Sequence, residues 1–201
     1  MIMATACHAA LKEWAVAIRA LDEGRQALII RKGGIREESN RFQVLHPEFL
    51  LFPSYEHQQA ELLRPEHAQG LTDAWEEAPT PGWLTFTHFA QTHRAFAVSE
   101  LEELQALAPH HIWSEEYAEK RLRWRPRQPL TAMVLRVYRL GTPARVRMLP
   151  RYAGCKSWLE LESPVVLGGM TAALSDAAFA ERADAIDRAI PITAQAVAAS
   201  R

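Results

Sequence analysis

The feature that most constrains the fold is a pair of apolar runs separated by turn residues, which occurs twice in the sequence. In the first instance, Trp14 to Leu21 and Arg25 to Lys32 flank Asp22-Glu23-Gly24. This spacing and turn chemistry predict a β-hairpin, with Gly24 supplying a positive φ. Because the first run is rich in alanine, a helix from Leu11 to Leu21 is the alternative.

The second instance lies toward the C-terminus. There, Leu130 to Leu140 and Ala144 to Leu149 flank Gly141-Thr142-Pro143, which predicts a second hairpin. Shorter strands are expected from the apolar pattern at Phe42 to Val44, Phe49 to Phe52 and Trp83 to Ala90.

Helices are expected between these two regions and near the C-terminus. Glu56 to Ala78 has a largely helical pattern, in which Pro65 forces a break. Strands near both ends with helices between them predict an α+β fold, with one domain over residues 1–201 and a mixed, mostly antiparallel sheet that could curl into a barrel. Helix starts are predicted at Ser99, which forms a capping box with Glu102, at Ser114 and at Ser175.

The composition is that of an ordinary globular protein. The chain has 201 residues, of which 48% are hydrophobic, and no window approaches the roughly 18 uninterrupted apolar residues that span a bilayer. Cys7 and Cys155 are the only cysteines and lack the paired CxxC spacing of a zinc site. A reducing compartment, and therefore a cytoplasmic location without membrane contact, is expected.

The net charge of −1 conceals a strong segregation of charge along the chain. Phe42 to Glu119 contains 2 basic and 13 acidic residues, whereas Lys120 to Leu159 contains 11 basic residues and no acidic residue. Such a basic block is typical of a surface that binds nucleic acid.

Part of this block has a regular pattern, because four arginines alternate with other residues from Arg121 to Arg127. In an extended segment their guanidinium groups would line one side, which suits phosphates, and Trp124 would lie on the other side. The alternative is that these arginines pair with the acidic segment from Phe42 to Glu119. The candidate phosphate- and base-binding residues of the block are Arg121, Arg123, Arg125, Arg127, Arg145, Arg147, Arg151, Lys156 and Trp158.

A second cluster combines acidic, basic and phenolic side chains in the stretch from His46 to His57. If the chain is extended there, Tyr55 and His57 share a face and Glu56 points away, which favours a Tyr–His pair. A histidine can transfer protons or bind a metal ion, although His57 could simply hydrogen-bond a loop. The candidate catalytic residues are His57, Tyr55, Glu48 and His46.

A third candidate site is the sequence Arg31-Lys32-Gly33-Gly34, where two cations precede glycines that let backbone N–H groups approach an anion. We expect Arg31 and Lys32 to share a pocket with Tyr55 to Gln58. The alternative is a hairpin turn with solvated charges. The P-loop, the complete Nudix box, HExxH, paired CxxC and the dinucleotide glycine motif are all absent, so the sequence predicts no metal ligands and identifies no cofactor.

Four strings resemble a known family. They are ALKEWAVAI from Ala10, RKGGIREE from Arg31, HPEFLLFPSYEHQ from His46 and GCKSWLEL from Gly154. Together they resemble the uncharacterised bacterial family described as domain of unknown function 1802, through most of the chain. Members lack an assigned activity, but relatives occur with restriction-endonuclease domains. The resemblance therefore implies a role near DNA and a restriction-type nuclease as a candidate partner.

Three functions are consistent with these features. The first is a nucleic-acid-binding accessory module for DNA or RNA, linked to DNA defence or restriction, in which the arginine block contacts phosphates. The second is a metal- or His-dependent enzyme that acts on a phosphate ester or nucleotide, with His57 as the base. The third is a protein-interaction scaffold. Convergence of the histidine cluster on one cleft would favour the enzyme, and exposed arginines beside aromatic residues would favour binding.

Overall fold

The computed structural model describes residues 5–32, 43–56, 58–76, 78, 80–154 and 156–190. These residues form a seven-stranded sheet in the order β2-β5-β4-β3-β1-β6, with β7 paired to β5. The strands are β1 (Ala6–Trp14), β2 (Leu28–Arg31), β3 (Glu48–Ser54), β4 (Trp83–Val98), β5 (Leu130–Arg147), β6 (Trp158–Val166) and β7 (Thr171–Ala172). The helices are α1 (Ala15–Asp22), α2 (Ala68–Glu76), α3 (Leu101–Ala106), α4 (Glu115–Arg123) and α5 (Asp176–Ala189).

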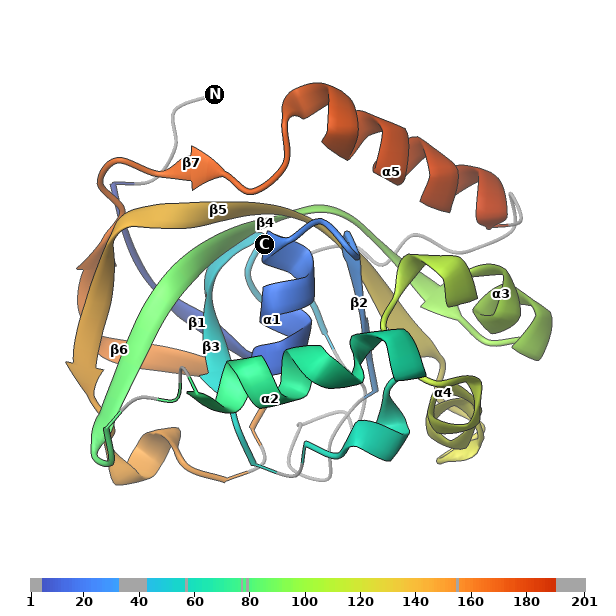
Figure 1. Ribbon diagram of the computed structural model, residues 1–201, viewed down its shortest axis with the longest axis horizontal. Coiled ribbons are helices and arrows are strands. Elements are labelled where there is room, and N and C mark those ends of the chain that lie inside the picture. The colour runs from blue at the N-terminus through green and yellow to red at the C-terminus, as the bar shows by residue number, and fades with distance from the viewer. Residues whose placement is uncertain are drawn as a thin grey trace.

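The predicted α+β class with a mixed, mostly antiparallel sheet is confirmed. Among the described strands, β1 and β3 pair in parallel and every other pairing is antiparallel. The long strands β4 and β5 arch over α1, so the sheet is strongly curled (Figure 1). The edge strands β2 and β6 do not pair with each other in the described part of the chain, and the barrel is therefore not closed.

The first predicted hairpin is wrong. The chain passes from β1 directly into α1, and the helical alternative holds only from Ala15 onward, because residues 11 to 14 are extended. The helix is favoured because it buries both sides: Ile18 contributes to the core inside the sheet, and Val16 to a second core under the helices. Gly24 does adopt the predicted positive φ, at 69°, but there it ends a helix, and the Arg25 N–H donates to the Ala20 carbonyl.

The second predicted hairpin is also wrong, because β5 continues through Gly141-Thr142-Pro143. Arg139 pairs with His88 and Ala144 pairs with Phe86, so residues 140 to 143 bulge out opposite one residue of β4. Gly141 is required because a Cβ there would lie 2.7 Å from the Gly169 carbonyl oxygen. The turn residues of this segment therefore make a bulge, on which the chain between β6 and β7 packs.

Most helix predictions agree with the structure. Ser114 and Ser175 are N-caps whose hydroxyl groups accept from the N–H groups of Tyr117 and Ala178. The helix predicted from Ser99 begins at Leu101, with Glu100 as its N-cap. The segment from Glu56 to Ala78 is helical in three short pieces: Ala60–Leu62, Pro65–His67 and Ala68–Glu76.

The other predicted strands agree in part. β3 and β4 include the segments expected at Phe49 to Phe52 and Trp83 to Ala90. Gln43 and Val44 are not in a strand, and Phe42 lies outside the described residues. None of the helices in the described ranges is long and apolar enough to cross a membrane.

Candidate functional site

A pocket of about 340 Å³ opens between α1, α2, the end of β3 and the first half of β4. This volume lies within the range of small-molecule sites, which is roughly 300–1,000 Å³. Its walls combine small apolar side chains with hydroxyl, imidazole and charged groups. The lining residues are Ala15, Ile18, Arg19, Asp22, Glu23, Pro53, Tyr55, Ala74, Thr85, Thr87 and His88.

An irregularity in β4 shapes one wall of the pocket. Successive side chains of a regular strand point to opposite faces, so Thr87 and His88 would normally diverge. The pairing of β4 with β5 shifts register between Phe86 and His88, and a bulge of this kind re-aims side chains. Thr85, Thr87 and His88 consequently all line the same pocket.

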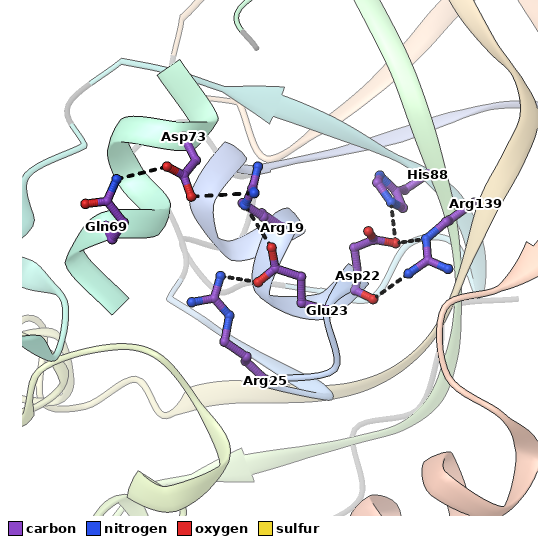
Figure 2. A network of polar contacts seen from close by, with 8 residues as sticks. All are labelled: Arg19, Asp22, Glu23, Arg25, Gln69, Asp73, His88 and Arg139. Carbon is purple, nitrogen blue, oxygen red and sulfur yellow. Dashed lines mark hydrogen bonds and ion pairs between the residues drawn. The ribbon is translucent and has the colours of Figure 1, made fainter. Parts of the chain in front are cut away.

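The polar centre of the pocket is Asp22, at the end of α1 (Figure 2). Its Oδ1 lies 2.9 Å from His88 Nε2 and 2.5 Å from Arg139 Nε, and its carbonyl oxygen accepts from Arg139 Nη2 at 3.0 Å. Thr87 Oγ1 lies 2.8 Å from His88 Nδ1. The two ring nitrogens of His88 therefore have different neighbours: Nδ1 faces the Thr87 hydroxyl and Nε2 faces the Asp22 carboxylate.

These contacts determine the protonation state of Asp22. Burial alone would raise the pKa of this carboxyl, but the hydrogen bonds and charges of His88 and Arg139 outweigh burial and lower the pKa below its ordinary value. Asp22 therefore lines the pocket as an ionised carboxylate at neutral pH. An ionised carboxylate only accepts hydrogen bonds.

A second chain of ion pairs fixes the other wall (Figure 2). Arg19 contacts Glu23 at 2.8 Å and Asp73 of α2 at 3.5 Å, and Arg25 also pairs with Glu23. Asp73 in turn accepts from Gln69 at 3.0 Å. The charges around Arg19 are thus largely matched, and α1 is tied to α2.

A cationic rim lies beside the pocket where β4 begins and β5 ends. The guanidinium carbons of Arg145 and Arg147 lie 4.2 and 4.3 Å from the centre of the Trp83 ring. Neither arginine forms an ion pair within the described part of the chain. Thr85, which lines the pocket, is the cross-strand partner of Arg145. We call Trp83, Arg145 and Arg147 the Arg/Trp rim.

The prediction that Arg121 to Arg127 form an extended row of four arginines is wrong. Arg121 and Arg123 belong to the last turn of α4, and Arg125 has a positive φ of 55°. Arg121 donates to the Tyr117 hydroxyl at 2.6 Å, and Arg123 pairs with Glu119 at 3.1 Å. The run is not extended because the helix that Ser114 and the acidic first turn start reaches Arg123, and the chain then turns through Arg125 and Arg127.

Other residues predicted for phosphate binding also have structural contacts. Arg151 pairs with Glu162 at 2.6 Å. Trp158 donates to the Gln43 carbonyl at 2.8 Å and packs edge-to-face on Phe49. Lys156 and Arg127 are exposed.

The described residues give no support to the predicted pocket joining Arg31 and Lys32 to Tyr55. Arg31 pairs with the buried Glu13 at 3.0 Å, Lys32 donates to the Leu122 carbonyl at 2.8 Å, and neither lines the pocket that contains Tyr55. Gln58 is buried and accepts from the Val16 N–H. Gly33, Gly34 and His57 lie outside the described residues.

The three candidate catalytic residues that the structure describes do not share the pocket. Glu48 accepts from Gln91 at 2.8 Å, and the ring of His46 contacts Trp158. Tyr55 lines the pocket and these two residues do not. Within the described ranges, no group of three or more His, Cys, Asp or Glu residues could hold a metal ion.

Sequence reasoning missed the residues at the centre of the site. Asp22 stands in a sequence that predicts a turn, and His88 in one that predicts a strand, so neither is a candidate site residue by sequence. Asp22 and Arg139 lie 117 positions apart, so no local pattern connects them. For the rim, the sequence did offer a signal, which was the basic block itself. The register of β4 and β5 places Arg145 and Arg147 of this block beside Trp83.

Comparison with known proteins gives a family but no activity. No curated protein matches the chain. The crystal structure of ASCH from Zymomonas mobilis matches with a TM-score of 0.38 and 10% identity, over 93% of this chain and 95% of that chain. Similarity at this level carries no argument about function. The family model for Domain of unknown function (DUF1802) matches residues 10–185, and the chain therefore belongs to that family.

Proposed function

We propose that the protein binds nucleic acid and that the Arg/Trp rim contacts the phosphates. The observation that carries this proposal is the position of Arg145 and Arg147, which are held over Trp83 without an acidic partner in the described residues. Stacking restrains each guanidinium group and leaves its N–H edges available for bidentate contact with a phosphate.

The surrounding charges support this choice of arginines. Most other arginines of the basic block are paired with carboxylates, although, among these pairs of described residues, only that of Arg123 involves the acidic segment from Phe42 to Glu119. The arginines paired with carboxylates are Arg123 with Glu119, Arg136 with Asp176, Arg139 with Asp22 and Arg151 with Glu162.

The rim also supplies planar groups on which bases can stack. The guanidinium planes of Arg145 and Arg147 lie over the partly exposed Trp83, and stacking on arginine or aromatic planes beside positive charge is typical of surfaces that hold single strands. A single strand is therefore the expected form of the ligand. Association with a restriction-type nuclease and a role in DNA defence stay expectations from the family resemblance.

The test is replacement of both rim arginines. Arg145→Gln with Arg147→Gln should weaken binding of a fluorescent single-stranded oligonucleotide by at least about tenfold at low salt, because charged hydrogen bonds contribute about 1.5–3 kcal/mol each. Anisotropy measures the affinity, and a thermal melt should show little change because both side chains lie on the surface.

A matched control removes two positive charges elsewhere. Arg182→Gln with Arg188→Gln alters α5, which lies far from the start of β4 (Figure 1), and should leave affinity nearly unchanged. Equal losses in the two double variants would show that only net charge matters. Absence of binding by the wild-type protein would show that the proposal is wrong.

A further inference from the structure

We propose that the pocket beside the rim takes one unpaired base of the bound strand and that Asp22 selects bases bearing an exocyclic amino group. This inference rests on the proposed function and specifies its ligand. Four observations carry it: the continuity of pocket and rim, the mixed apolar and polar lining, the charge inside the pocket, and the Oδ2 atom of Asp22, which has no hydrogen-bond partner among the described residues.

The pocket and the rim occupy one surface of the sheet. Trp83, Thr85 and Thr87 alternate along β4, and Arg145 lies opposite Thr85 on β5. Thr85 and Thr87 line the pocket, while Trp83 carries the rim arginines. A strand whose phosphates contact the rim can therefore turn a neighbouring base into the pocket.

The mixed lining suits a flat ring with polar edges. Ala15, Ile18, Pro53 and Ala74 supply apolar surface from α1, β3 and α2. Asp22, which lies one turn after Ile18 on α1, supplies polar groups together with the two threonine hydroxyls and His88. Bases taken out of a stack are held in this way, by packing on apolar or aromatic side chains and by hydrogen bonds to an edge.

The charge inside the pocket excludes a phosphate as its occupant. Asp22 and Glu23 both line it, and the guanidinium of Arg19 is matched by Glu23 and Asp73. A phosphate would lie beside carboxylates without an uncompensated cation. A neutral ligand that donates hydrogen bonds fits this lining.

Asp22 supplies the selective contact. Its Oδ1 accepts from Arg139 and lies 2.9 Å from His88 Nε2, whereas Oδ2 has no hydrogen-bond partner among the described residues. The amino group of cytosine donates to carboxylates, whereas uracil presents a carbonyl oxygen at the same position. The pocket should therefore favour cytosine over uracil.

The experiment compares homopolymeric cytosine and uracil oligonucleotides of equal length and backbone with the wild-type protein at neutral pH. Cytosine should bind about tenfold more tightly, as expected for one hydrogen bond to a charged group. Cytosine whose amino group carries two methyl groups should lose that advantage. Asp22→Asn should also lose it, because an amide can donate to the uracil carbonyl.

The control variant is Asp187→Asn, which alters an exposed aspartate of α5 that pairs with Arg94 and should keep the preference for cytosine. Thermal melts verify that each variant is folded. If Asp22→Asn does not fold, the comparison of cytosine with its dimethylated form decides the question with the wild-type protein alone.

The outcomes separate the two proposals. The wild-type protein could bind cytosine and uracil oligonucleotides equally well and lose affinity for both when Arg145 and Arg147 are replaced. That result would overturn base selection and leave the proposal of nucleic-acid binding intact. A preference that survives both Asp22→Asn and dimethylation would also overturn it. Failure to bind any strand would overturn both proposals.

Discussion

At the scale of single residues, local sequence indicates which side chains are chemically capable but not which of them meet. Arg145, Arg147 and Tyr55 are candidates by their residue types, and all three lie at the pocket or its rim. Arg31 has the pattern of an anion-binding residue, yet it neutralises Glu13, whose side chain is only 4% exposed. The difference arises because folding buries a carboxylate distant in sequence beside this cation, and the two then pair.

The Arg31–Glu13 pair gives the first prediction. Arg31→Gln should lower the free energy of unfolding by about 3 kcal/mol, because it leaves a buried carboxylate without its counter-charge. Glu13 keeps one hydrogen bond, from the Trp14 N–H. Urea unfolding measures the change, and adding Glu13→Gln should restore part of it. A fully stable Arg31→Gln protein would show that the pair is not structural.

His111 gives the second prediction, on pH. The residue is only 2% exposed, and burial, followed by the charges of Arg64 and His110, lowers its pKa from 6.5 to about 3. The unfolded chain therefore binds a proton more readily than the folded protein between those values. Stability should be fully present above about pH 6.5 and fall by up to about 1.4 kcal/mol per pH unit as the pH decreases toward 3.

The measurement is urea unfolding of the wild-type protein and of His111→Asn from neutral to acidic pH. The variant keeps a side-chain acceptor for the Trp113 N–H, which donates to His111 Nδ1 in the wild type. It should have a flatter pH dependence than the wild type. Parallel profiles for His111→Asn and wild type would contradict the burial argument.

At the scale of elements, helix caps and parts of the long strands could be predicted, whereas the full length of β4 and β5 and the chain reversals could not. Ser114 and Ser175 start helices where expected because capping is a local interaction. Both predicted hairpins failed because a glycine-containing turn signal does not specify which elements it connects. Gly24 ends a helix, and Gly141 permits a close approach of two segments.

Gly141 gives the third prediction. Gly141→Ala should destabilise the protein by about 1–3 kcal/mol, since its Cβ would lie 2.7 Å from the Gly169 carbonyl oxygen and 2.8 Å from that of Gly168. Gly168→Ala is the matched control, because a Cβ there has no atom within 4 Å. Thermal unfolding compares the two. Equal melting temperatures would show that the bulge adjusts without cost.

At the scale of the whole molecule, the near-neutral net charge of −1 is misleading. Folding pairs several arginines of the basic block with carboxylates from other segments and leaves Arg145 and Arg147 on Trp83. The sequence predicts the α+β class and the local excess of basic residues from Lys120 to Leu159. It does not predict which cations stay available, because that depends on the register of β4 and β5.

The most direct test of the central claim is the salt dependence of single-strand binding. Each phosphate neutralised contributes a slope of about −0.7 in log affinity against log salt concentration. Replacing Arg145 and Arg147 with glutamine should therefore flatten the slope by about 1.4, that is, about 0.7 for each of the two contacts. The Arg182→Gln, Arg188→Gln control should keep the wild-type slope. An unchanged slope in the rim variant would contradict the claim that these two arginines neutralise phosphates.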